Sequence, residues 1–77
     1  MLKIKDNVDL KELEKYGFKE LIIAYTKRVY LGNDNDDKVF YGIGKDDRNI
    51  RIIRLDGELD DTLYDLIKDG LVVKVDD

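Results

Sequence analysis

The chain has 77 residues, of which 43% are apolar and 42% charged, with a formal net charge of −4. It contains no His, Cys, Ser, Trp, Pro or Gln, which excludes a Ser–His or Cys–His nucleophile, a zinc site built from Cys and His, and any disulfide. No apolar run approaches the roughly 20 residues that a membrane-spanning helix needs, and the first residues lack the apolar stretch of a signal peptide. We therefore expect a single domain, residues 1–77, in the reducing cytoplasm and without membrane contact.

The N-terminal part predicts a short strand followed by a short helix. Residues 2–5 alternate between apolar and basic side chains, which fits a short strand or a lead-in that lies over the core. Asp9 is followed three residues later by Glu12, the spacing of a capping box, and Gly17 is a typical helix stop. These signals predict a helix from about Leu10 to Tyr16.

Three β-like runs follow, at Leu21–Tyr30, Lys38–Ile43 and Ile50–Leu55. The turns between them, residues 32–37 and 44–49, are rich in Gly, Asn and Asp, so we expect an antiparallel three-strand meander. The first run is apolar on both faces, which predicts a central strand or a strand whose second face meets a partner. The residues expected on one face are Leu21, Ile23, Tyr25 and Val29, and those expected on the other include Ile22, Ala24 and Tyr30.

The C-terminal end predicts a helix, a glycine stop and a strand. Apolar residues at i, i+4, i+7 and i+8 form one helical stripe, and either Asp60 or Asp61 is expected to cap the helix. Gly70 is expected to be left-handed, with Leu71 folding back on the helix. The strand 71–75 should turn Leu71, Val73 and Val75 to the core and pair with the N-terminal segment or a meander edge. The residues of the helical stripe are Leu59, Leu63, Leu66 and Ile67.

These elements together predict an α+β fold in the order (β)αβββαβ. It consists of a small antiparallel sheet, made of the three-strand meander plus the C-terminal strand, with two short helices on one face.

No motif in the sequence builds a catalytic or metal site. Asn33–Asp37 begins like a calcium loop, but the Gly and Glu that an EF-hand requires at its sixth and twelfth positions are missing. The glycines of residues 42–45 lack the spacing of a P-loop. Asp46–Asp47 and Asp60–Asp61 are adjacent carboxylates, whose expected roles are turn formation and helix capping. We therefore expect no cofactor, no metal and no enzymatic activity.

The charge is unevenly distributed along the chain. Residues 48–55 contain three Arg and no acidic residue, whereas residues 56–77 contain eight acidic and two basic residues. Either these charges balance within the molecule, or the basic strand and nearby aromatic rings form a surface for single-stranded nucleic acid. The candidate interaction surface comprises Ile22, Ala24, Lys27, Arg28, Tyr30, Arg51 and Arg54.

The opening KIKDNVDLKELEKYGF and the ending LYDLIKDGLVVKV resemble small uncharacterised proteins of phages and prophages of Gram-positive bacteria. The resemblance covers both ends of the chain and consists mainly of helix-capping motifs. It implies a small α+β accessory protein and transfers no catalytic residue. The ending LIKDGLVVKV also looks like the junction of recognition helix and wing in winged-helix proteins, but the aspartates of this helix would oppose DNA phosphates.

We therefore expect a small cytoplasmic, non-catalytic protein of phage accessory type that binds another protein or forms a homodimer. The alternative is a nucleic-acid-associated accessory protein that uses Arg51 and Arg54, although the net negative charge argues against nucleic acid as the partner.

Overall fold

The computed structural model describes residues 1–30, 37–54 and 60–75, and the predicted α+β class is confirmed. The turn expected at Asp56–Gly57, the calcium-like residues 33–36 and Leu59 of the helical stripe lie outside these ranges. The elements are, in chain order, β1 (Leu2–Ile4), the 3-10 helix η1 (Leu10–Tyr16), β2 (Lys19–Glu20), β3 (Ala24–Tyr30), β4 (Asp37–Gly44), β5 (Ile50–Arg54), α1 (Thr62–Lys68) and β6 (Val72–Lys74).

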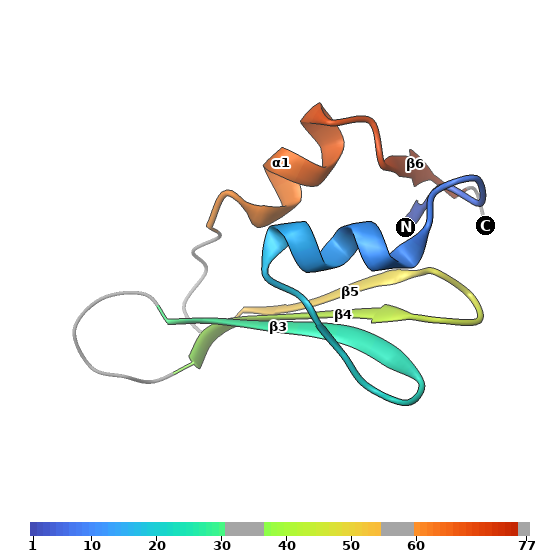
Figure 1. Cartoon of the computed structure of the whole chain (residues 1–77). Helices are drawn as coiled ribbons and strands as arrows, with labels where there is room; N and C mark the ends of the chain where they lie inside the picture. The colour runs from blue at the N-terminus through green and yellow to red at the C-terminus, as the bar shows by residue number, and fades with distance from the viewer. Residues whose placement is uncertain (31–36, 55–59, 76–77) are drawn as a thin grey trace.

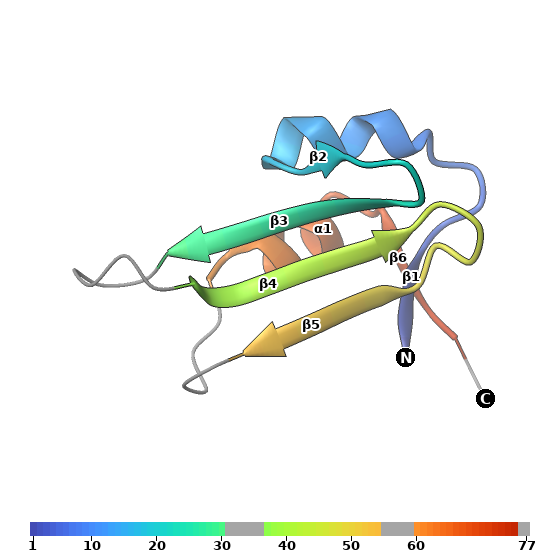
Figure 2. The same ribbon diagram turned by 90° about the horizontal axis from the view of Figure 1, so that it is seen from below.

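The main sheet has the strand order β2-β3-β4-β5, and every neighbouring pair is antiparallel. The predicted meander is therefore confirmed as β3-β4-β5, and β2 adds a short edge strand that the sequence did not indicate. Both helices lie on one side of this sheet (Figure 1). The opposite side, which we call the outer face, is turned toward the viewer in Figure 2, with α1 behind the sheet.

The core lies between the sheet and the helices. Tyr41 is fully buried at its centre, and its ring meets Phe18 edge to face with ring centroids 6.1 Å apart. Alternating residues of the meander point inward, as period-two burial requires. The buried apolar residues are Ile4, Leu13, Phe18, Tyr25, Val39, Tyr41, Ile43, Ile50 and Leu66.

The helix ends follow the predicted capping pattern. The Asp9 side chain accepts a hydrogen bond from Lys11 N at 3.0 Å, and Gly17 is left-handed with φ 90°. Gly70 is left-handed with φ 80°, and Leu71 N donates to Leu66 O at 3.1 Å. Both glycine stops are therefore confirmed, whereas the first helix is a 3-10 helix.

The C-terminal strand pairs with the N-terminal segment, which was one of its two expected partners. β1 and β6 form a separate two-stranded antiparallel sheet. Val72 lies opposite buried Ile4 and packs against the core, whereas Val73 is exposed. The prediction that Val73 faces the core was therefore wrong, because Val73 pairs with Lys3 on β1, whereas Leu71 packs against the core as expected.

Two further predictions were wrong, one about the extent of a strand and one about burial. The strand expected over Leu21–Tyr30 begins only at Ala24, because the chain turns sharply at residues 21–23. Ile67 of the helical stripe is exposed. α1 is a seven-residue helix that buries only Thr62 and Leu66, so its contact with the core is narrower than the stripe implied.

Candidate interaction surface

The tight hairpin between β2 and β3 carries strongly exposed apolar side chains. Ile22 is 92% exposed, Ile23 77% and Leu21 45%, and we call these three residues the apolar tip. Leu21 N donates to Ala24 O at 2.8 Å, and Lys45 N donates to Ile23 O at 2.9 Å. These bonds fix the apolar tip against the end of β4, so its exposure belongs to an ordered turn.

Turn chemistry does not account for isoleucine at the apolar tip. Tight hairpins favour Gly, Asn and Asp, because those residues accept the positive φ angles that such turns use. In the described ranges Arg48 is the only non-glycine residue with positive φ, so Ile22 and Ile23 have ordinary backbone angles. A branched aliphatic side chain contributes most to stability when it is buried. Several adjacent exposed side chains of this kind commonly mark a site of contact with another molecule.

An ion pair braces the base of the apolar tip. Lys45 Nζ lies 2.7 Å from Glu20 Oε2 and 5.6 Å from the ring centroid of buried Tyr25. The hydrogen bond from Lys45, reinforced by its positive charge, lowers the pKa of Glu20. The pair therefore ties β2 to the end of β4 at neutral pH and holds the apolar tip in place.

The outer face continues the apolar surface from the tip. Phe40 lies in register between Arg28 on β3 and Ile53 on β5. The Arg28 guanidinium carbon is 6.0 Å from the centroid of the Phe40 ring, and Ile53 is 58% exposed. No described helix or strand covers this face (Figure 2).

Beside Phe40, the outer face is hollowed where small residues of β3 and β4 lie opposite one another. Ala24 pairs with Gly44, and Thr26 pairs with Gly42. The hollow has a volume of about 440 Å³, and the turn after β4 borders it at the end nearest the apolar tip. It begins directly behind the apolar tip, since Ile23 belongs to its lining.

The two glycines of the hollow differ in what the fold demands of them. A Cβ at Gly44 would collide with Asp47 Oδ1, so the turn itself requires glycine there. A Cβ at Gly42 would meet only Phe40 Cε1 at 3.7 Å, an ordinary contact, and its φ is not left-handed. Glycine inside a strand costs about 0.5–1 kcal/mol relative to alanine and often marks a close approach of another molecule.

The structure brings together four of the predicted surface residues. Ala24, Arg28 and Arg51 lie on the outer face, with Arg51 Nη2 2.8 Å from Asp47 Oδ2, and Ile22 lies in the turn that leads into Ala24. Tyr30 and Arg54 end β3 and β5, but their side chains lie outside the described part of the molecule. The predicted set omitted Phe40, Gly42 and Ile53, although each is out of phase with a neighbour on the core side, namely Tyr41, Ile43 and the partly buried Ile52.

Lys27 is not part of the outer face, which corrects its inclusion in the predicted surface. It pairs with Tyr41 and points to the helix side of the sheet. Its Nζ atom donates to Tyr16 O and to Thr62 Oγ1, each at 2.7 Å. The strand alternation places Lys27 on the same side as Tyr25, and the two helix ends supply the oxygen atoms that its ammonium needs.

Asp60 completes this polar cluster under α1. It accepts hydrogen bonds from the Tyr41 hydroxyl and from Thr62 Oγ1, the latter at 2.5 Å. Burial acts to raise the pKa of Asp60, but the hydrogen bonds from Thr62 and Tyr41 outweigh it and the pKa is lowered. Burial and the bond to Asp60 raise the pKa of Tyr41 well above its usual range. Every group has a partner, so the cluster fastens α1 to the sheet.

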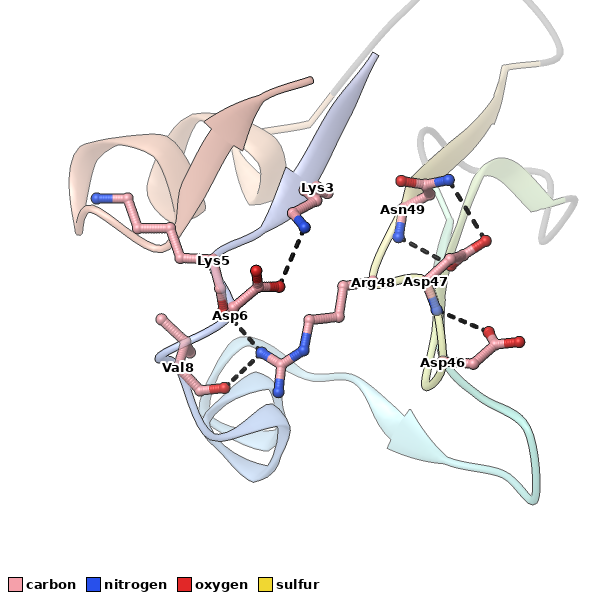
Figure 3. A network of polar contacts seen from close by, with 8 residues as sticks. All are labelled: Lys3, Lys5, Asp6, Val8, Asp46, Asp47, Arg48 and Asn49. Atoms are coloured by element: carbon pink, nitrogen blue, oxygen red, sulfur yellow. Dashed lines mark hydrogen bonds and ion pairs between the residues drawn. The ribbon is translucent and has the colours of Figure 1, made fainter. Parts of the chain in front are cut away.

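Arg48 is also used inside the fold. Its Nη1 atom donates to Lys5 O at 2.7 Å and to Val8 O at 2.6 Å, which connects the turn between β4 and β5 to the N-terminal segment (Figure 3). Its own carbonyl accepts from Ile4 N at 2.9 Å. Arg48, which belongs to the predicted basic segment, therefore holds the N-terminal segment against the turn between β4 and β5.

The adjacent carboxylates Asp46–Asp47 and Asp60–Asp61 only partly have the expected roles of turn formation and helix capping. Asp47 caps its turn by accepting from Asn49 N at 2.9 Å, as Figure 3 shows. Asp61 occupies the cap position of α1 without a side-chain hydrogen bond, while Asp60 bonds as described above. No group of acidic residues placed to hold a metal ion occurs in the described ranges, and none of the helices there is long and apolar enough to cross a membrane.

Comparisons with protein-family models, curated proteins and solved structures find no significant match.

Proposed function

We propose that this protein is a non-catalytic cytoplasmic accessory protein that acts by binding protein. The apolar tip and the outer face form the contact surface. The observation that carries the proposal is the exposure of Ile22 and Ile23 in an ordered turn that neither core packing nor turn chemistry explains. The resemblance of the two chain ends to phage proteins supports a place among accessory proteins of phage type.

The contact surface has the composition of a protein interface. It combines the apolar side chains of Ile22, Ala24 and Phe40 with the guanidinium groups of Arg28, which lies over the Phe40 ring, and Arg51. Aromatic residues and arginine are enriched at protein interfaces, whereas lysine and acidic residues are depleted there. Burying one isoleucine side chain completely against a partner stabilises a complex by about 1.5–3 kcal/mol before the costs of association.

Nucleic acid receives less support as the partner. Lys27 and Arg48 donate to oxygen atoms inside the fold, and Arg51 pairs with Asp47. A phosphate-binding surface needs several cations directed at the ligand. In the predicted basic strand, the described residues Arg48 and Arg51 both have partners within the fold. Too little positive charge is therefore directed outward from these residues to bind phosphate.

A capture experiment in the native host tests the proposal. The protein carries a photoreactive amino acid in place of Ile22, and the control carries it at exposed Ile67 on α1. We expect crosslinks to protein from position 22, unaffected by nuclease, and none from position 67. Equal crosslinking from both positions, or loss of the crosslinks after nuclease treatment, would contradict a protein-binding role for the apolar tip.

A further inference from the structure

A second hollow lies on the outer face, on the β2 side of Phe40, and we call it the basic pocket. Its volume is about 470 Å³, which is within the range of pockets that hold ligands. Thr26 and Phe40 line both this pocket and the hollow over Gly42, so the two adjoin. Leu21 of the apolar tip also belongs to its lining. The basic pocket is therefore continuous with the rest of the contact surface.

The described charged residues that line the basic pocket are Lys19, Lys27 and Arg28, so all of them are cationic. Lys19 on β2 lies opposite Thr26 on β3, which places both side chains on the same side of the sheet. Arg28 follows two residues later on that side, over the ring of Phe40. Among the described residues, the side chains of Lys19 and Thr26 have no hydrogen-bond or ion-pair partner.

From this arrangement we propose that the protein partner places a carboxylate in the basic pocket, from an acidic side chain next to the apolar residues that receive the apolar tip. The inference rests on the proposed protein-binding function and names the chemistry of the partner's surface. The Lys19 ammonium supplies the opposite charge, and the Thr26 hydroxyl donates a hydrogen bond to the carboxylate. The Phe40 ring packs against the methylene groups of the acidic side chain.

The distribution of charge selects an acidic partner, although the chain itself has a net charge of −4. Asp65 and the aspartates at the two ends of α1 lie on the other side of the sheet (Figure 1). Glu20, which follows Lys19 in the sequence, is bound by Lys45 at 2.7 Å. The charge that the pocket presents to a partner is therefore positive. Complementary charge of this kind speeds association and sets specificity more than it adds affinity.

A nucleic acid fits the basic pocket less well than a single carboxylate. A phosphate chain needs several cations directed at it. The Lys27 ammonium instead points through the sheet to Thr62, and Asp46 and Asp47 border the adjoining hollow. One carboxylate needs only one or two charged donors. A protein surface with an acidic side chain beside apolar residues satisfies the pocket and the apolar tip at once.

Charge reversal at Lys19, combined with the photoreactive amino acid at position 22, tests the inference in the native host. Lys19→Glu should lower the yield of position-22 crosslinks to protein by about tenfold, because it sets like charges against each other in the contact. The control Lys68→Glu reverses an exposed lysine of α1 and should leave the yield unchanged. Both variants should keep the wild-type circular dichroism spectrum, since neither lysine has a side-chain partner in the described ranges.

Amide NMR with peptides of defined charge tests the basic pocket itself. At low salt, a capped peptide of sequence Glu-Leu-Glu should shift the amide signals of Lys19, Thr26 and Arg28 until they saturate. Its neutral analogue Gln-Leu-Gln should leave them in place. The shifts should disappear in Lys19→Gln and persist in Lys68→Gln.

Several outcomes would overturn the inference. They are equal shifts with both peptides, no shift with millimolar acidic peptide, and stronger shifts of the same signals with a single-stranded oligonucleotide. Undiminished position-22 crosslinks in Lys19→Glu would also overturn it, while leaving the proposed protein-binding function intact. If the wild type gave no position-22 crosslinks to protein, the proposed function and this inference would both be lost.

Discussion

Lys27 Nζ lies 2.7 Å from Thr62 Oγ1 and thereby joins the middle of β3 to the first residue of α1. The same ammonium donates to the carbonyl that ends η1, at Tyr16. Lys27 thus binds the end of η1 and the start of α1 to the same strand of the sheet. Its long side chain carries the charge from the sheet to these oxygen atoms and passes close to Gly17, where an added Cβ would meet Lys27 Cε at 3.2 Å.

Lys27→Met should destabilise the fold by about 1–3 kcal/mol, because it keeps the aliphatic stem but leaves two half-buried oxygen atoms without their donor. Urea unfolding followed by circular dichroism measures the change. The matched variant Lys68→Met alters an exposed lysine of α1 and should stay within about 0.5 kcal/mol of the wild type. Equal effects of the two variants would show that the cluster does not fasten α1.

Two of the five tyrosines should ionise late at high pH. The hydrogen bond to Asp69, with burial, raises the pKa of Tyr16 to about 12, and burial with the bond to Asp60 raises that of Tyr41 further. The folded state therefore keeps protons that the unfolded state releases from about pH 10. This contribution to stability is complete below about pH 10 and is lost as the pH rises through the folded pKa values.

Absorbance at the tyrosinate band gives the readout for this pH dependence. Part of the tyrosine absorbance of the folded protein should titrate well above pH 10, and Tyr16→Phe should remove a share of that part. A single transition of all tyrosines at the ordinary pKa, while circular dichroism still reports a folded chain, would contradict both hydrogen bonds.

Gly70→Val should lower the free energy of unfolding by more than the roughly 1 kcal/mol of an ordinary glycine replacement. The φ of Gly70 is +80°, and no atom lies within 4 Å of an added Cβ, so the cost comes from the backbone conformation. A β-branched residue resists this region, whereas asparagine tolerates it, so Gly70→Asn should cost less. An unchanged melting temperature for the valine variant would falsify the assigned helix ending.

Arg48→Ala should destabilise the fold by about 1–3 kcal/mol, since the carbonyls of Lys5 and Val8 lose their shared donor. Arg48 also has φ +60°, so Arg48→Gly loses the same hydrogen bonds but relieves the backbone and should destabilise less. Chemical unfolding compares the two, and amide exchange at Ile4 should accelerate in both. If Arg48→Ala were more stable than Arg48→Gly, the proposed relief of the backbone would be contradicted.

The helix ends and the meander were predictable because their signals are local. An Asp before η1 and a glycine after each helix act within a few residues, as do the Gly, Asp and Asn residues of the turn after Ile43. Inward alternation of Tyr41 and Ile43 followed from the strand period alone. These features need no knowledge of distant neighbours.

The apolar tip was not predictable in the same way. Leu21, Ile22 and Ile23 have high β propensity, and the turn there results from the pairing of β2 with β3, not from a turn-forming residue. The inward role of Lys27 depends on oxygen atoms of Tyr16 and Thr62, which lie far from it in the sequence. Only the fold brings those atoms together.

The pairing of β1 with β6 has a consequence for the order of events during synthesis. Leu2–Ile4 find their partner only when Val72–Lys74 have left the ribosome, because the two strands lie near opposite ends of the chain. Until then Ile4, which is fully buried in the finished fold, has no β6 strand beside it. Contacts so distant in sequence are slow to form, so β6 closes over Ile4 only after the meander and both helices have been made.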